Sequence, residues 1–123
     1  MRLQLLTLAI ATGLLGWWSC GQSTAPNAIG GDTIALGSYY FAPMLDSVVA
    51  ASNDSVNITF LWTIGNVSHN VTWDTGPGMT LPANSPTRSD GTYLLNLGLG
   101  TYTYHCTFHL VDWNMSGTIV VYK

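Results

Sequence analysis

The sequence predicts an all-β domain, and more narrowly a two-sheet antiparallel Greek-key β-sandwich of roughly seven to eight strands. Short runs rich in Val, Ile, Thr and aromatic residues recur along the chain, separated by Gly, Asn, Asp and Pro turn signals. Past the N-terminal segment, no run of about ten residues or more has the apolar period of a helix. The length of 123 residues fits one such domain.

The first half of the domain contains alternating and continuous strand patterns. Val56, Ile58 and Phe60 alternate with more polar residues, so they share one face of a strand over residues 56–62. The run at 39–43 ends in a proline, which suits an edge strand or a kink. The strands predicted here are residues 33–36, 39–43, 46–51, 56–62 and 69–73.

The second half begins with a long loop rich in Gly, Pro and Asn, predicted from Asp74 to Pro86. Three more strands follow, at residues 92–97, 101–107 and 117–122. On the middle one, Tyr102, Tyr104 and Cys106 fall on the same face. If the two aromatic rings face the core, the cysteine points inward at the end of its strand.

Residues 1–19 have the features of a signal peptide. The apolar run that follows Arg2 is too short to span a bilayer comfortably. Residues 20–31 are rich in Ser, Ala, Pro, Asn and Gly, which predicts a flexible tether. Residues 32–123 then form the predicted sandwich domain.

The end of the predicted signal peptide resembles a bacterial lipoprotein cleavage site, because Ser19 directly precedes Cys20. Lipidation of Cys20 would anchor the protein to a membrane, and ordinary cleavage near Ser19 is the alternative. We therefore expect an exported protein of the periplasm or cell envelope that contacts the membrane only through this lipid anchor.

The charge of the chain is low and acidic. Charged residues make up only 7% of the sequence. Beyond the predicted signal peptide, Arg88 and Lys123 are the two cations set against six carboxylates. Because the chain has no basic patch, no nucleic-acid partner is expected.

A thiol, an imidazole and a thioether lie close together near the C-terminus, in the spacing Cys106-x2-His109-x5-Met115. A loop of this length can fold back so that the three side chains meet, and His69 can supply a second imidazole. Two histidines, a cysteine and a weakly bound methionine describe a trigonal copper site with a long axial bond. Zinc sites rarely use methionine, and no second cysteine lies nearby to support an iron–sulfur cluster.

Purely structural explanations compete with the metal site. A disulfide between Cys20 and Cys106 would suit an exported protein, but it leaves the His and Met spacing unexplained. His69 alone would suit a hydrogen-bonded position, and Met115 could simply fill the core. The shared pattern of the four residues favours metal ligation.

The C-terminal segment resembles the signature of the plastocyanin/azurin cupredoxins, the type 1 blue copper proteins. The resemblance is carried by residues 100–109, GTYTYHCTFH, and by residues 115–121, MSGTIVV. Residues 68–71, SHNV, are similar to the segment that carries the first ligand in that family. The resemblance covers roughly residues 33–123 and is strongest over the last 25 or so.

The resemblance implies one copper ion that cycles between Cu(I) and Cu(II). The metal ligands that it implies are His69, Cys106, His109 and Met115. It also implies that Asn70 ties the two ligand-bearing loops together through Thr107, since such outer contacts hold the ligands in place.

The chain departs from the family pattern at two points. The gap from His109 to Met115 holds five residues, one more than is usual in plastocyanin-like members. Phe108 stands where plastocyanins have a proline, so it keeps an N–H that could donate to the Cys106 sulfur. The resemblance also implies that His105 points outward at a second partner surface. It implies an apolar patch around the C-terminal histidine, for which this chain offers Leu110, Val111, Trp113 and Met79.

These features predict a blue copper electron carrier that shuttles single electrons between redox proteins of the cell envelope. A copper-binding module for storage, delivery or sensing is the alternative, and a metal-free structural sandwich is a third possibility. An enzyme is not expected, because a site closed by four protein ligands leaves no open position for a substrate. We expect the protein to act as a monomer.

Overall fold

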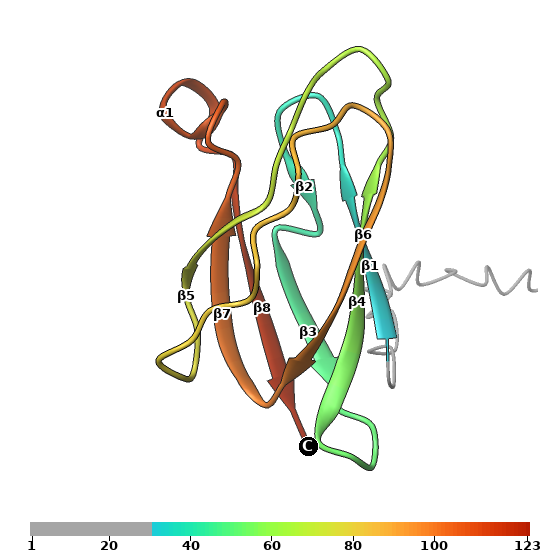
Figure 1. Ribbon diagram of the computed structural model, residues 1–123, viewed down its shortest axis with the longest axis vertical. Coiled ribbons are helices and arrows are strands. Elements are labelled where there is room, and N and C mark those ends of the chain that lie inside the picture. The colour runs from blue at the N-terminus through green and yellow to red at the C-terminus, as the bar shows by residue number, and fades with distance from the viewer. Residues whose placement is uncertain (1–30) are drawn as a thin grey trace, which may run out of the picture.

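The computed structural model describes residues 31–123 and shows two four-stranded sheets packed face to face (Figure 1). The predicted two-sheet sandwich is therefore confirmed. Its elements are β1 (Gly31–Leu36), β2 (Phe41–Ala42), β3 (Leu45–Val49), β4 (Ser55–Trp62), β5 (Thr72–Thr75), β6 (Gly91–Gly98), β7 (Gly100–His105), α1 (Leu110–Trp113) and β8 (Ser116–Tyr122).

The predicted signal peptide, residues 1–19, and all but the last residue of the predicted tether lie outside the described residues. The first strand begins at Gly31, one residue before the expected start of the domain. Within residues 31–123, no helix is long and apolar enough to cross a membrane.

The strand directions are mixed, where the sequence predicted purely antiparallel sheets. The sheet orders are β2-β1-β4-β6 and β3-β8-β7-β5, and in each sheet one neighbouring pair, β1–β4 and β3–β8, is parallel. Parallel neighbours require a crossover connection rather than a hairpin. The chain supplies it by changing sheets: β3 lies in the opposite sheet from β1 and β4, so it forms part of the path between them.

The core lies between the sheets and is rich in aromatic residues. The inward residues of β4 alternate as predicted, and Val56, Ile58, Phe60 and Trp62 are all buried. Tyr104 on β7 packs edge-on against Phe41 at 4.8 Å and Phe60 at 5.1 Å between ring centroids. Such edge-to-face pairs are a favoured geometry for aromatic rings.

The ring of Tyr104 lies over Gly117, its direct neighbour on β8. A Cβ atom at position 117 would lie only 2.4 Å from the Tyr104 hydroxyl oxygen and 2.5 Å from its Cζ atom. The glycine is therefore required by this close approach. It makes room for the largest fully buried side chain in the described residues.

Several segments differ from their predicted form, and the strand expected at 39–43 is reduced to β2. Residues 69–73 do not form one strand: His69 makes an isolated bridge with Arg88, and β5 begins only at Thr72. Residues 110–113 form a short helix that the sequence did not indicate. Asn114 ends this helix in the left-handed conformation, with φ of 48°, which asparagine tolerates better than most residues.

Candidate metal centre

Three side chains that suit a metal meet at one end of the sandwich. The Nδ1 atoms of His69 and His109 are 3.1 Å apart, and the Cys106 sulfur lies 3.8 Å from the first and 3.5 Å from the second. His69 is 1% exposed and Cys106 is fully buried. The structure thus brings together three of the four residues that the sequence spacing singled out, with their donor atoms facing one another.

The backbone of His69 is held on two sides. Its N–H donates to the carbonyl of Arg88 at 2.9 Å, and its carbonyl accepts from the N–H of Arg88 at 3.0 Å. The same carbonyl also accepts from the indole N–H of Trp62 at 3.2 Å. These bonds attach the histidine to the long 76–90 connection and to the end of β4. They therefore fix the backbone position from which the imidazole extends.

Cys106 and His109 lie on a loop that is closed at its base. Cys106 directly follows β7, and its N–H donates to the carbonyl of Met115 at 3.0 Å, just before β8 begins. Inside the loop, the His109 N–H donates to the Cys106 carbonyl at 3.2 Å. The His109 carbonyl accepts from the N–H groups of Trp113 and Met115, both at 3.2 Å. The loop therefore has its own backbone hydrogen bonds, which position the cysteine and the histidine together.

The predicted link between the two ligand-bearing segments is present. The Thr107 N–H donates to Oδ1 of Asn70 at 2.9 Å, and the Asn70 amide donates to Oγ1 of Thr107 at 2.8 Å. Asn70 follows His69 directly, and Thr107 follows Cys106 directly. One amide side chain therefore fixes the distance between the histidine on one segment and the cysteine on the other.

The electrostatics of the site favour a neutral imidazole at position 69. Burial lowers the pKa of His69 below its ordinary value of 6.5, and the neighbouring charge of a protonated His109 lowers it further, while the nearby backbone of Gly37 has the opposite effect. Neutral imidazole is the form that binds metals. Two ring nitrogens and a free thiol that converge inside the protein suit one soft or borderline cation.

The fold matches solved copper proteins. A mutant of amicyanin in its reduced state is 23% identical to the chain, with a TM-score of 0.59, over 80% of this chain and 88% of amicyanin. Auracyanin from Roseiflexus castenholzii is 17% identical, with a TM-score of 0.57, over 76% of this chain and 98% of auracyanin. The described domain has the cupredoxin fold.

A larger protein contains the same fold. The copper-containing nitrite reductase from Thermus scotoductus SA-01 is 19% identical, with a TM-score of 0.58 over 74% of this chain. The chain spans only 22% of that reductase, so the similarity concerns one part of it. No protein-family model and no curated protein sequence matches the chain.

Other residues singled out in the sequence lie around the centre of this cupredoxin domain. Met115 is buried, with 1% exposure, and its backbone closes the ligand loop. Phe108 is exposed, and within residues 31–123 its N–H is not among the groups that hydrogen-bond to the Cys106 sulfur. The donor expected at this sulfur is therefore absent from the described geometry.

The predicted outward residue, His105, points away from the core but is paired. Its Nδ1 atom lies 2.7 Å from a carboxylate oxygen of Asp74 on β5, and its side chain is only 16% exposed. Alternation along β7 explains this position, since Tyr104 and Cys106 on either side are buried. The histidine links two neighbouring strands on the outer face of the sheet.

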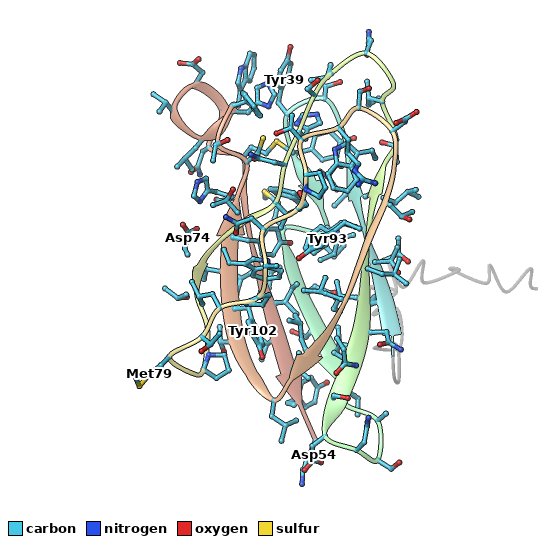
Figure 2. The ribbon with its side chains drawn as sticks, in the orientation of Figure 1. Tyr39, Asp54, Asp74, Met79, Tyr93 and Tyr102 are labelled. Carbon is cyan, nitrogen blue, oxygen red and sulfur yellow. The ribbon has the colours of Figure 1, made fainter. Side chains whose placement is uncertain are left out.

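The predicted apolar patch is correct in part. Leu110, Val111 and Trp113 are exposed on α1, beside the ligand loop. Met79 is fully exposed at the opposite end of the sandwich from Tyr39 (Figure 2), so it does not belong to this patch. The loop that carries it runs along the sandwich, and its position could not be inferred from composition.

Sequence reasoning missed two groups of residues that shape the centre. Arg88 and Ser85 attach the long connection to the His69 segment, and the Ser85 hydroxyl accepts the Val71 N–H at 2.8 Å. Tyr39, for which the sequence predicts a strand, lies between β1 and β2 and contacts His109 ring to ring. A serine in a polar loop and a tyrosine in an apolar run carry no signal that points to a distant metal site.

Proposed function

We propose that this domain is a type 1 copper protein that carries single electrons between redox proteins. The observation that carries the proposal is the convergence of His69, Cys106 and His109, whose ligand atoms all lie within 4.8 Å of one another. Two imidazoles and one thiolate in a buried trigonal arrangement are typical of blue-copper centres. The similarity to amicyanin and auracyanin supports the proposal at the level of the fold.

Each residue has a defined part in this proposal. His69, Cys106 and His109 would hold the copper ion, and the buried Met115 would be a weaker fourth ligand. Copper would supply a one-electron couple between Cu(I) and Cu(II). The chain's own contribution is a set of ligands fixed by backbone bonds and by Asn70, so that little has to move when the charge changes.

Electron exchange would take place at the end of the sandwich that carries α1. His109 is partly exposed there, whereas His69 and Cys106 are buried. Phe108, Val111 and Trp113 expose apolar surface around it. Exposed apolar side chains of this kind, with Asp112 as the one carboxylate on the same helix, suit brief contact with a redox protein, and the protein would act as a monomer in such encounters.

The proposal also covers the location of the protein in the cell and its role as a carrier. We place the protein outside the cytoplasm, in the periplasm or cell envelope, with lipidated Cys20 as its membrane anchor. It would act as a carrier and not as an enzyme, because four protein ligands leave no open coordination position for a substrate. The alternative is a protein that stores, delivers or senses copper with the same ligands.

The visible spectrum of the copper-loaded protein tests the proposal. We expect an intense charge-transfer band from the Cys106 thiolate to Cu(II), and its loss in Cys106→Ser. Met115→Gln should keep the band but shift it and alter the reduction potential. Val111→Ala, on the exposed part of the loop, is the control. A copper-loaded protein without this band would refute the blue-copper centre.

Voltammetry separates the carrier from the copper-delivery alternative. A carrier should show a reversible one-electron wave and should keep its copper in the presence of a competing chelator. A delivery protein should release copper readily to the same chelator. Loss of copper during the electrode cycle would favour delivery over electron transfer.

A further inference from the structure

An aromatic pair lies directly against the imidazole of His109. The ring of Tyr39 stacks on the ring of Trp113, with centroids 4.3 Å apart and planes at 9°. The same tyrosine meets the His109 ring edge-on, at 5.1 Å and 70°. Tyr39 is 38% exposed and Trp113 is 57% exposed, so the pair forms an outer wall rather than part of the core. Figure 2 shows Tyr39 at the same end of the sandwich as the ligand loop.

The three residues form a closed cycle of contacts. The Trp113 N–H donates to the His109 carbonyl at 3.2 Å, so one turn of α1 joins their backbones. The Trp113 ring then packs on Tyr39, and the Tyr39 ring returns to the imidazole of His109. The tyrosine comes from the connection between β1 and β2, which belongs to the other sheet. The cycle therefore fixes the ligand loop against a part of the fold outside the loop.

The other ring contacts of the His109 imidazole are with His69, at 4.8 Å between centroids, and with the exposed ring of Phe108, at the longer distance of 6.4 Å. The hydrogen bonds that the described residues give to its ring run to Nδ1 of His69 and to the Cys106 sulfur, which are themselves candidate ligands. His69 is different, because burial restricts its ring from all sides. A partly exposed histidine ring that is bound only by the metal's other ligands would rotate freely when those bonds break.

We propose that the stack of Tyr39 and Trp113 is a clamp on the His109 imidazole. It holds the ring in its ligand position before the metal binds, and keeps it there when the charge of the metal changes. The two aromatic residues act as positioning residues: among the described residues, their ring contacts join them to each other and to His109. This inference rests on the proposed copper function for its consequence, but the clamp itself is a property of the metal-free chain. Trp113 lies in the gap between His109 and Met115, which is one residue longer than usual. The clamp therefore assigns a structural role to this longer gap.

The clamp predicts a loss of preorganisation when it is removed. An edge-to-face ring contact lowers the population of the alternative His109 rotamers, relative to the ligand position, by a factor of roughly 2 to 12. The apparent affinity for a metal falls in proportion to the fraction of protein whose ligand is correctly placed. Tyr39→Ala and Trp113→Ala should therefore each weaken Cu(II) binding by up to about tenfold.

The metal-free protein provides the first test. Nuclear magnetic resonance relaxation of the histidine side chains should show the His109 ring as ordered in the wild type and mobile in Tyr39→Ala and Trp113→Ala. His69 serves as the internal reference. Tyr39→Phe keeps the ring and should retain order, while Val111→Ala removes exposed apolar surface from the same helix without touching the stack. Tyr39→Leu, which keeps apolar bulk, covers the case in which the alanine variant folds poorly.

The second test is Cu(II) affinity by competition, measured on the same variants. Mobility of His109 together with weaker binding in the two clamp variants, and neither effect in Val111→Ala, supports the clamp. A His109 ring that stays as ordered as in the wild type overturns it, and so does equal mobility in Val111→Ala. If the wild type gives no thiolate-to-copper band, the proposed function fails while the ring measurement still decides the clamp.

Discussion

Asn70 and Thr107 join two segments of the chain through a pair of hydrogen bonds, one of 2.9 Å from the Thr107 N–H and one of 2.8 Å to the Thr107 hydroxyl. Each residue directly follows a candidate metal ligand. The amide of Asn70 uses its acceptor and one of its donors on the same partner. This geometry ties the position of the cysteine to that of the first histidine without any metal.

Removing this link should loosen the metal-free centre. Asn70→Ala removes both of these solvent-exposed bonds, and at about 0.5–1.5 kcal/mol net for each we expect a loss of roughly 1–3 kcal/mol in the free energy of unfolding. Thr107→Val removes only the hydroxyl and should cost less. Denaturant unfolding of both variants without metal measures the difference. Equal losses in the two variants would show that the backbone N–H bond contributes nothing.

Ser85 should be required for holding the 76–90 connection. Its hydroxyl accepts the Val71 N–H at 2.8 Å and its own N–H donates to the Val71 carbonyl at 3.0 Å, in a buried position. Ser85→Ala leaves a buried N–H unsatisfied, and we expect a loss of about 1–3 kcal/mol. Thermal or denaturant unfolding provides the measurement. The exposed Ser85 neighbour Thr87, changed to Ala, is the control and should unfold like the wild type.

Gly117→Ala should disturb the core directly below the ligand loop. The new methyl group would overlap the buried ring of Tyr104, and overpacking of this kind costs roughly 1–3 kcal/mol. Gly78→Ala is a matched control, because a Cβ atom there meets nothing within 4 Å. The prediction is wrong if both alanine variants unfold at the same denaturant concentration.

Asp46 is a buried carboxyl group between the two sheets. It is 5% exposed and faces Asp32. Burial, together with the charge of Asp32 and a hydrogen bond to its carboxyl group, raises the pKa of Asp46 to about 6, while the backbone of Ser47 has the opposite effect. Asp46 also raises the pKa of Tyr104, on top of the larger effect of that hydroxyl's burial. Among the described residues, one Asp46 oxygen and the Tyr104 hydroxyl have no hydrogen-bond partner.

The raised pKa of Asp46 predicts that stability falls as the pH rises. The folded chain holds its proton up to about pH 6, whereas the unfolded chain releases it near 3.8. The contribution of Asp46 to the free energy of unfolding is therefore fully present below pH 3.8. It is lost between about pH 4 and 6 and amounts to roughly 3 kcal/mol in total. Asp46→Asn should remove this pH dependence. Compared with the wild type at the same pH, the variant should therefore be more favourable at pH 7.5 than at pH 4.5. The measurement is denaturant unfolding of metal-free protein, with the exposed Asp90→Asn as control.

Local patterns predicted much of the centre. Alternation along the strand at Tyr102, Tyr104 and Cys106 placed the thiol inward, and the structure confirms that it is fully buried. The spacing from Cys106 to His109 fits one turn of backbone hydrogen bonds, which the loop contains. These relationships depend on residues a few positions apart, so the period of the strand and the length of the loop are enough to reveal them.

Contacts between distant segments could not be predicted in the same way. The parallel pairing of β1 with β4 depends on which sheet the intervening strands join, and alternation does not specify that. The meeting of Tyr39 with Trp113 and the bridge between His69 and Arg88 depend on how loops cross the end of the sandwich. The prediction that Met79 belongs to the apolar patch is wrong for the same reason, because hydrophobicity does not specify toward which end of the sandwich a loop runs.

The bond from the Cys106 N–H to the Met115 carbonyl has a consequence for how this surface can change. It separates the base of the loop, which carries the ligands, from the tip, which faces solvent. Substitutions of exposed side chains within residues 110–114 therefore change the solvent-facing surface of the tip while the ligand end keeps its backbone hydrogen bonds. Trp113 is the exception, since its ring stacks on Tyr39, and a change at that position also alters the contact of the loop with the connection between β1 and β2.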